Sequence, residues 1–295
     1  MAIKLYDLTD ISSQRETFKE IIRTLSLVDP GYDPSRFAAV YENIVALFGG
    51  KYPGFRASNT KYHNLEHTCS VTLAAARLIH GLRVQGHIFP SRNMELCLIA
   101  ALFHDTGLIQ TEEERDGTGA RFTVGHEERS IRLMAAHLAA NGFSEGETSD
   151  CGHIIKATII SLPMAEIPFR SEGIRTMGKI LGSADLIAQM SDRRYLEKLP
   201  LLFLEFKEAG IPGFETPLQL FKNTGEFYHS VVRKRLREEM ADVSSAALFH
   251  FRKRWDIDRD LYAESISNNL EYMSRIYREC DNSFDSLLKK LRRRV

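Results

Sequence analysis

Apolar side chains recur every three or four residues along almost the whole chain, and strict alternation of apolar and polar residues is rare. This spacing places the apolar residues of a segment on one face of an α-helix, whereas a half-buried β-strand requires alternation. The sequence therefore predicts an all-α fold, built as a helical bundle. We expect helices over residues 14–27, 34–48, 65–82, 93–106, 127–140, 149–161, 174–191, 196–209 and 217–239, with one or two more between 241 and 291.

Short polar residues mark where several of these helices begin. Asp33, Asn64 and Ser149 each precede an apolar-periodic segment, and their side-chain oxygens suit the first free backbone N–H groups of a helix. Two segments lack the helical period: residues 112–125 are polar and contain glycine, and residues 162–173 contain proline. We expect the first of them to be a mobile loop.

The length of the chain limits the size of its core, and its charge limits the partners that it can attract. A chain of 295 residues can bury a large core without disulfides. Lys plus Arg equal Asp plus Glu at 39 each, so no overall field favours nucleic acid or an anionic membrane as a partner. The basic runs near residues 235, 253 and 291 are interpreted as solvated helical faces.

We predict three parts along the chain. Residues 1–33 form an N-terminal helical segment, residues 34–195 form the central domain, and residues 196–295 form a helical extension packed on it. The extension is a candidate surface for homo-oligomer contacts.

The cysteines and the hydropathy favour a cytoplasmic protein. The four cysteines are widely spaced and form no CxxC pair, which is typical of reduced thiols. The first ten residues lack the basic and apolar regions of a signal peptide, and the longest near-apolar run, residues 96–103, is too short to cross a bilayer. We therefore expect a cytoplasmic location and no membrane partner.

The same apolar run carries the first candidate site. Residues 96–103 are apolar all round a helix, so that helix should be buried, and His104 and Asp105 follow at its end. A buried carboxylate is unfavourable unless it is paired or bound to metal. Adjacent helical residues diverge by about 100°, so the two side chains approach one ion from different directions and leave one Asp105 oxygen to bridge a second. Taken alone, the pair is equally explained as a helix-terminal His beside a capping Asp.

A second polar group precedes the helix expected from residue 65. Tyr62, His63, Asn64 and His67 stand close together there. With Asn64 as N-cap, His67 lies in the first turn, where the positive end of the helix dipole favours the neutral, ligating imidazole. His63 lies just outside the helix and can point into the same space.

The third element is Asp185, which stands among apolar residues of the helix over 174–191. Its carboxylate requires a cation or hydrogen-bond donors. Together with His67, His104 and Asp105 it offers two imidazoles and two carboxylates from three helices, a donor set that suits Zn, Mn, Fe or Mg. The sequence therefore predicts one or two divalent metal ions as cofactors.

The ordered motifs YHNLEH, FHD, HEERS, IKAT and SADL lie between Tyr62 and Leu186 and resemble the HD-domain metal-dependent phosphohydrolases. The pattern is most similar to the cyclic-nucleotide phosphodiesterase branch and to bacterial predicted HD phosphohydrolases. The resemblance implies an HD-domain helical bundle, hydrolysis of a phosphoester by a metal-activated water, and a small phosphorylated substrate of the nucleotide class.

The resemblance also implies roles for individual residues. His67, His104, Asp105 and Asp185 match the ligands of the first metal, Asp105 being catalytic as well, and His63 matches the general acid for the leaving oxygen. The candidates for a second metal or its water shell are His126, Glu127 and Thr158, and the candidate substrate contacts are Tyr62 and Asn64.

The chain also departs from the phosphodiesterase pattern. Leu108 stands where those enzymes carry a further His, and Ala188 stands where they carry Asn. Gln189 and Gln219 are loose candidates for their purine-binding glutamine. The metal centre is therefore better supported than specificity for cyclic nucleotides.

Two alternatives remain open. Some HD-domain proteins hold two irons and use dioxygen, and here that ligand order would recruit His153 in addition to His126. His153 and Thr158 fall on different helix faces, so one of them is expected to line the site, and the IKAT match favours Thr158. The second alternative is a sensor that binds metal or nucleotide without turnover.

Other motifs are given ordinary structural interpretations. Residues 173–180 match the spacing of a phosphate-binding loop but lack the Ser or Thr that follows its Lys and the strand that precedes it. The remaining histidines are interpreted as surface or partly buried residues: His80, His87, His137, His229 and His250.

Overall fold

The structure is a computed structural model that describes residues 3–280 and 283–291. Apart from one isolated bridge between Phe55 and Thr111, these residues form helices, turns and loops, so the all-α prediction is confirmed. The α-helices are α1 Gln14–Val28, α2 Ser35–Phe48, α3 Leu65–Val84, α4 Ser91–Phe103, α5 His126–Ala140, α6 Glu145–Lys156, α7 Glu172–Ser191, α8 Tyr195–Glu208, α9 Pro217–Phe227, α10 Ala246–Trp255, α11 Leu261–Arg278 and α12 Phe284–Lys290.

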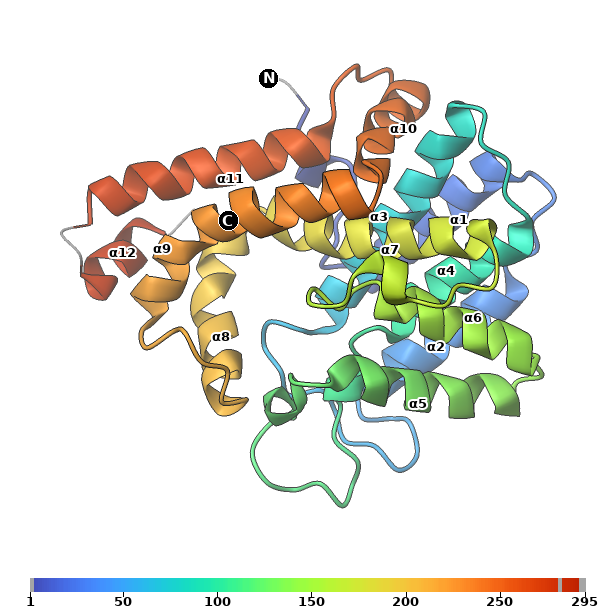
Figure 1. The fold of residues 1–295 in the computed structure, drawn as a ribbon, viewed down its shortest axis with the longest axis horizontal. Coiled ribbons are helices and arrows are strands. Elements are labelled where there is room, and N and C mark those ends of the chain that lie inside the picture. Colours follow the sequence, from blue (N-terminus) through green and yellow to red (C-terminus); the bar gives the residue numbers. More distant parts are fainter. Residues whose placement is uncertain (1–2, 281–282, 292–295) are drawn as a thin grey trace.

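Helix α3 is the centre of the molecule and packs against α1, α4, α7 and α10 (Figure 1). Its residues are buried without a break from Val71 to Leu82, so it has no solvent face over that length. Gly81 makes one of these contacts possible, because a Cβ atom there would lie 1.9 Å from the backbone oxygen of Ala246 in α10. At the other end, the Asn64 side chain accepts a hydrogen bond from the His67 N–H at 3.1 Å, as predicted for an N-cap.

Helix α4 is buried from Met94 to Phe103 and ends earlier than the sequence predicts. A 3₁₀ turn, Thr106–Leu108, follows it and packs against α5. Gly107 permits that contact, since a Cβ there would lie 2.0 Å from the His126 backbone oxygen. The Ser130 hydroxyl of α5 donates to the His104 carbonyl at 2.6 Å and accepts from the Gly107 N–H at 2.8 Å. The end of α4 is therefore fixed to the beginning of α5.

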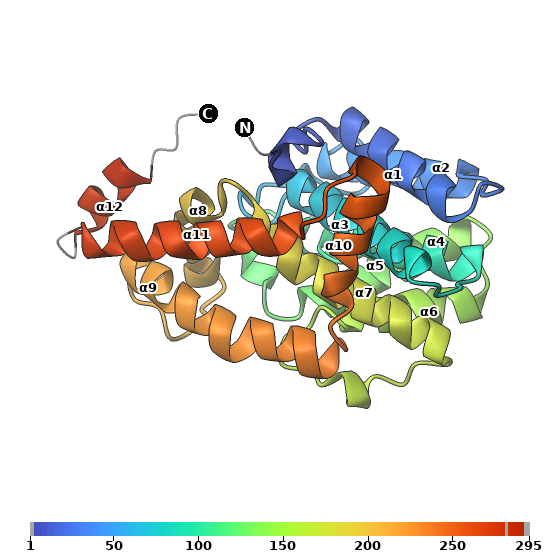
Figure 2. The same ribbon diagram turned by 90° about the horizontal axis from the view of Figure 1, so that it is seen from above.

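The C-terminal helices divide between two places (Figures 1 and 2). Helices α8 and α9 pack on each other beside the end of α7, and α11 runs along α7 and contacts α8. Helix α10 instead crosses back onto α3 and belongs to the central bundle. The extension predicted for residues 196–295 thus contributes one helix to the core and several to its flank.

Between α9 and α10 the chain forms two π-helical segments, Tyr228–Val232 and Arg235–Glu239. Arg235 is only 3% exposed, in contrast to the solvated face predicted for this basic run. Its guanidinium donates to the backbone oxygens of Ala157, Ile159, Ile160 and Leu162 at 2.8–3.2 Å. A cation from the C-terminal part therefore holds the turn that follows α6.

Several predicted boundaries are wrong for local reasons. Ser149 lies inside α6, which begins earlier because Ser144 and Glu147 form a capping box. Asp33 stands one residue before the N-cap Pro34, although its carboxylate still accepts from the Ser35 N–H. Three helices rather than one or two follow residue 241 among the described residues.

The segment 112–125 is less irregular than predicted. It contains a 3₁₀ helix, Gly119–Phe122, and Thr118 and Gly119 bond to Glu208 and Asn59 respectively. Residues 173–180, which match the spacing of a phosphate-binding loop, lie within α7 and form no such loop. No helix in the described ranges has both the length and the apolar character needed to cross a membrane.

Candidate metal centre

Four side chains meet at the junction of α3, α4 and α7. The His67 Nε2 atom lies 3.2 Å from Asp185 Oδ1 and 3.4 Å from Asp105 Oδ2. The His104 Nε2 atom lies 3.3 Å from Asp105 Oδ2 and 3.8 Å from Asp185 Oδ1. The structure therefore brings together the four residues that the sequence predicts as ligands of the first metal, and we call them the metal cluster.

The ligand atoms have the spacing of a cation site. One atom each from His67, His104 and Asp185 lies within 4.8 Å of the other two, so this group can hold a metal ion. Buried His104 Nε2 and Asp105 Oδ2 have no hydrogen-bond partner of acceptable geometry. Unpaired buried polar atoms are unfavourable, and a divalent cation among them would satisfy both. The side chains present thus fit a metal.

Backbone carbonyls set the ring orientation of His104 and His126. His104 Nδ1 lies 2.7 Å from the Ala101 oxygen, and His126 Nδ1 lies 2.8 Å from the Thr123 oxygen. A carbonyl only accepts, so each Nδ1 carries the hydrogen, and each Nε2 directs its lone pair toward Asp105 when the ring is neutral. Such a second hydrogen bond is typical of metal-ligating histidines.

Charged neighbours shift the pKa values of His104 and Asp105 in opposite directions. Burial alone would lower the pKa of His104, but the Asp105 and Asp185 carboxylates outweigh it and raise that pKa to about 9. Burial raises the pKa of Asp105, and the neighbouring His104 and His126 more than reverse this and hold it well below its ordinary value. A cation that binds in the metal cluster would therefore displace a proton from His104.

Asp105 faces a second group through its other oxygen. Its Oδ1 atom lies 3.3 Å from His126 Nε2, whereas its Oδ2 atom faces His67 and His104. Glu127 Oε2 lies 3.4 Å from His126 Nδ1. Thr158 follows α6 and lines the same cavity. The three candidates for a second metal or its water shell thus lie beside Asp105 or across the cavity from it.

His63 is held by a residue that the sequence analysis missed. Its Nδ1 atom lies 2.6 Å from the Oε2 atom of Glu205 in α8, and Glu205 is only 5% exposed. The other carboxylate oxygen accepts the backbone N–H groups of Lys61 and Tyr62 at 2.8 and 2.7 Å. Glu205 therefore fixes both the loop before α3 and the His63 ring. The available sequence signal is its place beside the apolar residues Leu202, Phe203 and Phe206 of α8.

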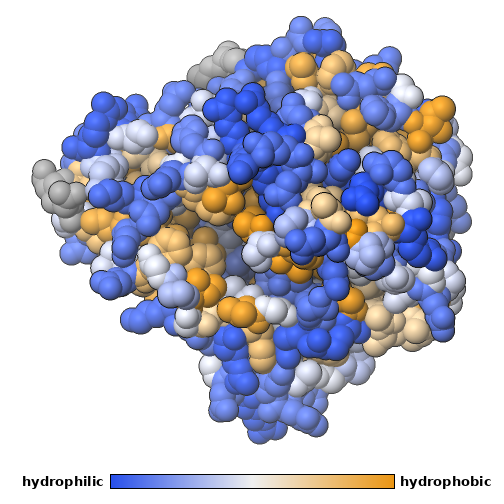
Figure 3. Space-filling model, viewed as in Figure 1, coloured by the Kyte–Doolittle hydropathy of each residue, from blue (hydrophilic) through white to orange (hydrophobic). Residues whose placement is uncertain are grey.

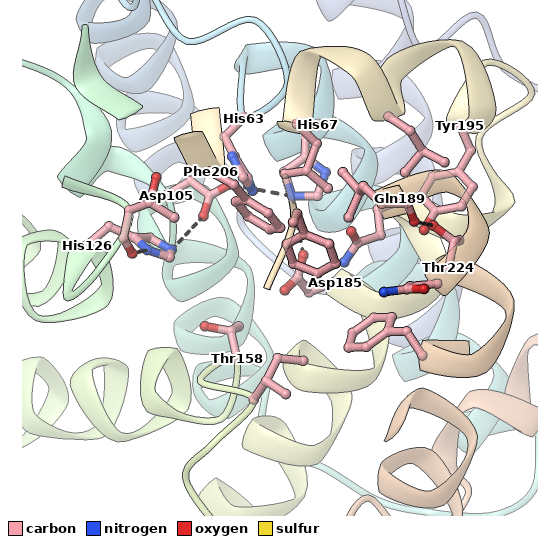
Figure 4. Close-up of a pocket in the computed structure, with 18 of the residues that line it drawn as sticks. His63, His67, Asp105, His126, Thr158, Asp185, Gln189, Tyr195, Phe206 and Thr224 are labelled. Atoms are coloured by element: carbon pink, nitrogen blue, oxygen red, sulfur yellow. Dashed lines mark hydrogen bonds and ion pairs between the residues drawn. The ribbon is translucent and has the colours of Figure 1, made fainter. Parts of the chain in front are cut away.

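The two groups open into a cavity of about 330 Å³, within the usual size range of ligand sites (Figure 4). One wall carries His63, His67, Asp105, His126 and Asp185. The opposite wall comes largely from α8 and α9 and is mainly apolar, with Gln189 of α7 between them. On the surface, Figure 3 shows a hollow bordered by hydrophobic side chains.

Some predicted site residues lie outside this cavity. Tyr62 is buried behind it and donates its hydroxyl to Gln189 Oε1 at 2.9 Å. Asn64 caps α3 and uses its amide N–H on the Lys61 carbonyl. Neither residue lines the cavity, so this geometry does not make them substrate contacts. His153 lines a separate surface groove next to Lys156, which leaves Thr158 as the one of that pair that faces the site.

The interpretation of the remaining histidines is correct for His87 and His229, which are exposed, and wrong for three others. His137 is buried and lies 3.0 Å from the Tyr52 hydroxyl. His80 and His250 are buried against each other, with their Nδ1 atoms 2.9 Å apart. Gln219 lies on the exposed side of α9 and does not line the cavity.

Comparison with known proteins gives one family assignment. No curated protein matches the chain. A profile of the Npun_R2479-like family matches residues 31–248, which cover α2 to α9 and reach into α10. This match spans well over half of the chain, and the chain therefore belongs to the Npun_R2479-like family.

Proposed function

We propose that this protein is a metal-dependent phosphohydrolase that acts on a small phosphoester. The observation that carries the proposal is the metal cluster itself, in which His and Asp side chains from three regions of the chain meet and three of the four line a cavity. The resemblance of the motifs between Tyr62 and Leu186 to HD-domain phosphohydrolases supports the same activity.

His67, His104, Asp105 and Asp185 would hold the first divalent ion, and Asp105 Oδ1 with His126 would hold a second. A mixed set of imidazole and carboxylate ligands suits Zn, Mn, Fe or Mg. An ion held there would lower the pKa of water in the cavity and neutralise the charge of a phosphate group.

His63 supplies the proton that a departing alcohol requires. Glu205 occupies its Nδ1 atom, so Nε2 is the ring nitrogen that remains for the cavity that His63 lines. Proton donation of this kind contributes about 100- to 10,000-fold to the rate.

The two alternatives are less well supported. A di-iron oxygenase with the ligand order given above would use His153, which lies in a different groove from the metal cluster. A sensor without turnover needs no positioned acid, whereas His63 is oriented by a buried carboxylate at 2.6 Å.

The test is metal analysis of the purified protein followed by a screen of phosphoesters with added Mn²⁺, Mg²⁺ or Zn²⁺. We expect bound metal and phosphoester hydrolysis in the natural protein, and loss of both in Asp105→Ala with helix content unchanged. His87→Ala, at an exposed position, is the control. Full metal occupancy in Asp105→Ala would refute the ligand assignment, and bound iron with substrate-dependent oxygen uptake would favour the oxidative alternative.

The role of His63 has its own measurement. His63→Ala should lose about 100- to 10,000-fold on an alkyl phosphoester, whose leaving group needs a proton, and far less on a p-nitrophenyl phosphoester. Glu205→Gln should show the same dependence on the leaving group to a smaller degree. An equal loss on both substrates would mean that His63 is structural.

A further inference from the structure

We propose that the cavity takes a molecule with a single phosphate group whose alcohol part is apolar, such as an alkyl or aryl phosphoester, rather than a nucleotide. This inference rests on the proposed function and narrows it. Three features of the described part of the cavity support it: its charges, the composition of the wall opposite the metal cluster, and the residues at its opening.

The positive charge in the cavity is placed to neutralise one phosphate group. Of the described residues that line it, none is Lys or Arg. The cationic groups available are the histidines and the metal that Asp105 and Asp185 would hold, and these lie on one wall. A second or third phosphate would extend away from that wall without a counter-charge, and removing an unpaired charge from water is strongly unfavourable. Nucleoside di- and triphosphates are therefore poor ligands.

The wall opposite the metal cluster is mostly apolar. Leu199, Leu202 and Phe206 come from α8, Leu220 comes from α9, and Phe214 comes from the loop between them. Apolar surface that lines an enclosed space favours an apolar occupant, because the ligand and the wall both leave water on binding. The alcohol part of the substrate faces this wall when its phosphate lies at the metal cluster.

The polar groups of the same wall are largely engaged within the protein. The Tyr62 hydroxyl donates to the Gln189 carbonyl oxygen at 2.9 Å. The Thr224 hydroxyl donates to the Leu220 backbone oxygen at 2.9 Å. Recognition of a nucleobase requires a matched set of donors and acceptors. This wall offers few such groups: the Tyr195 hydroxyl, which already interacts with Thr224, the Gln189 amide N–H group and Asn223.

The opening of the cavity is apolar as well. Ile160 and Phe227 line the cavity and are 40% and 39% exposed. Val124, which follows the lining residue Thr123, is 74% exposed. Exposed apolar groups gathered at the opening of a site are typical of a binding surface. They allow an alkyl chain longer than the cavity to leave it along apolar side chains.

The experiment uses the metal-loaded full chain and three straight-chain substrates, butyl, hexyl and octyl phosphate, each as the monoester and as the methyl diester. The leaving groups have the same chemistry, so kcat/KM reports burial of the chain. We expect kcat/KM to rise about fourfold per methylene group until the cavity is filled. ADP and ATP should be neither hydrolysed nor competitive at the same concentration.

Binding provides a readout that does not depend on turnover. Calorimetry with butyl, hexyl and octyl phosphonate should give the same increase in affinity with chain length. Phe206→Ala and Leu220→Ala should flatten that increase, whereas Leu204→Ala, a control on α8 that is 57% exposed and outside the cavity, should not.

The results separate this inference from the proposed function. A flat dependence on chain length, or tighter binding of ATP than of octyl phosphonate, would overturn the inference even if phosphoesters are hydrolysed. The opposite outcome is also distinguishable. If phosphonate affinity rises with chain length but the metal-loaded protein hydrolyses no ester of the series and no nucleotide, the preference of the cavity for an apolar chain would be upheld and the proposed hydrolase activity would be refuted.

Discussion

The two ends of α3 carry buried histidines with opposite electrical surroundings. His67, near the N-terminus of the helix, is 8% exposed and faces the carboxylates of Asp105 and Asp185. His80, near the C-terminus, is 3% exposed and faces His250 of α10. Arg77, Lys253 and Arg254 surround this second group, which we call the closed pair.

The comparison shows that a buried histidine indicates a metal only through its neighbours. An imidazole nitrogen without a hydrogen-bond partner occurs in both places, at His104 Nε2 and at His250 Nε2. In the metal cluster the nearby charges are negative, and the pKa of His104 is raised to about 9. In the closed pair burial and the nearby cations lower the pKa of His80 to about 4. The first environment attracts a cation and the second repels one.

The closed pair instead contributes to the packing of α3 against α10 and α11. A hydrogen bond between two imidazole Nδ1 atoms requires one to donate and the other to accept, so the accepting ring is neutral. The lowered pKa values of His80 and His250 favour the neutral form of the donating ring as well. The Arg77 guanidinium lies 5.6 Å from the ring centres of both Phe251 and Trp255 and donates to the Tyr262 hydroxyl at 3.1 Å. These contacts join α3 to α10 and α11.

The largest expected effect concerns the metal cluster. A divalent ion at a thousand times its dissociation constant should raise the free energy of unfolding by about 4 kcal/mol, because it binds only the folded chain. Asp185→Asn should abolish most of this gain, since it removes a charged ligand. Thermal unfolding at increasing metal concentration measures the effect.

The matching variant in the closed pair is His250→Gln, in the α10 residue that contacts His80 of α3. It should lower the stability of the metal-free protein and leave the gain from metal intact. If His250→Gln removed that gain as completely as Asp185→Asn, the two ends of α3 would not be independent.

The second effect is acid sensitivity of the closed pair. The pKa of His80 is lowered from 6.5 to about 4 in the folded chain by burial and then by Arg254 and Lys253, and the pKa of His250 is lowered by burial, Arg77, His80 and Arg254. The unfolded chain therefore binds protons more readily. The stabilisation is present above pH 6.5 and is lost as the pH falls toward 4. The loss should reach about 3 kcal/mol.

Denaturant unfolding of the metal-free protein between about pH 7 and pH 4.5 measures this loss. A double variant, His80→Gln with His250→Gln, should lose less stability over the same range, and the metal cluster contributes equally to both proteins. Parallel pH profiles would show that the closed pair does not titrate as described.

The metal cluster could be predicted from the sequence because each ligand leaves a local trace. His104 and Asp105 end a helix that is apolar all round, Asp185 stands in an apolar segment, and His67 follows a capping Asn. Such ionisable residues in apolar surroundings need a compensating partner. The structure brings these side chains together, with His67, Asp105 and Asp185 lining the cavity and His104 buried in contact with Asp105.

The supporting residues leave no comparable trace. Arg235 lies in a run of other charged residues, and Glu205 is a single carboxylate at the end of an apolar run. Their partners are distant in the sequence: His63 is 142 residues from Glu205, and Ile160 is 75 residues from Arg235. Their roles depend on tertiary packing. Glu205 meets His63 because α8 packs on the loop before α3, and Arg235 meets Ile160 because the π-helical segment packs on the turn after α6. The sequence analysis places His80 and His250 at surface or partly buried positions for the same reason, since contact between α3 and α10 buries them.

The third effect compares two glycines, one beside each histidine group. A Cβ at Gly107 would lie 2.0 Å from the His126 backbone oxygen, and a Cβ at Gly81 would lie 1.9 Å from the Ala246 backbone oxygen. Both Gly→Ala variants should lower stability by about 1–3 kcal/mol, because backbone has to move apart. Thermal unfolding of the metal-free proteins measures this loss.

Metal affinity should differ between the two glycine variants. Gly107→Ala moves α5, and with it His126, away from Asp105, so it should weaken metal binding as well as the fold. Gly81→Ala separates α10 from α3 and should leave metal affinity near that of the natural protein. Equal affinities in the two variants would show that the turn after α4 does not set the distance between Asp105 and His126.

The smallest effect concerns the cap of α3. Asn64→Ala removes the acceptor for the His67 N–H and should reduce stability by about 1 kcal/mol. The variant destabilises the first turn of α3, which carries His67, so metal affinity should fall too. Exchange of amide hydrogens near His80, at the other end of the helix, should be unchanged. Ser144→Ala is the matched control, since Ser144 caps α6 away from the metal cluster. If both variants lost stability and neither lost metal affinity, the first turn of α3 would be held by its packing, and the cap would not be what positions His67.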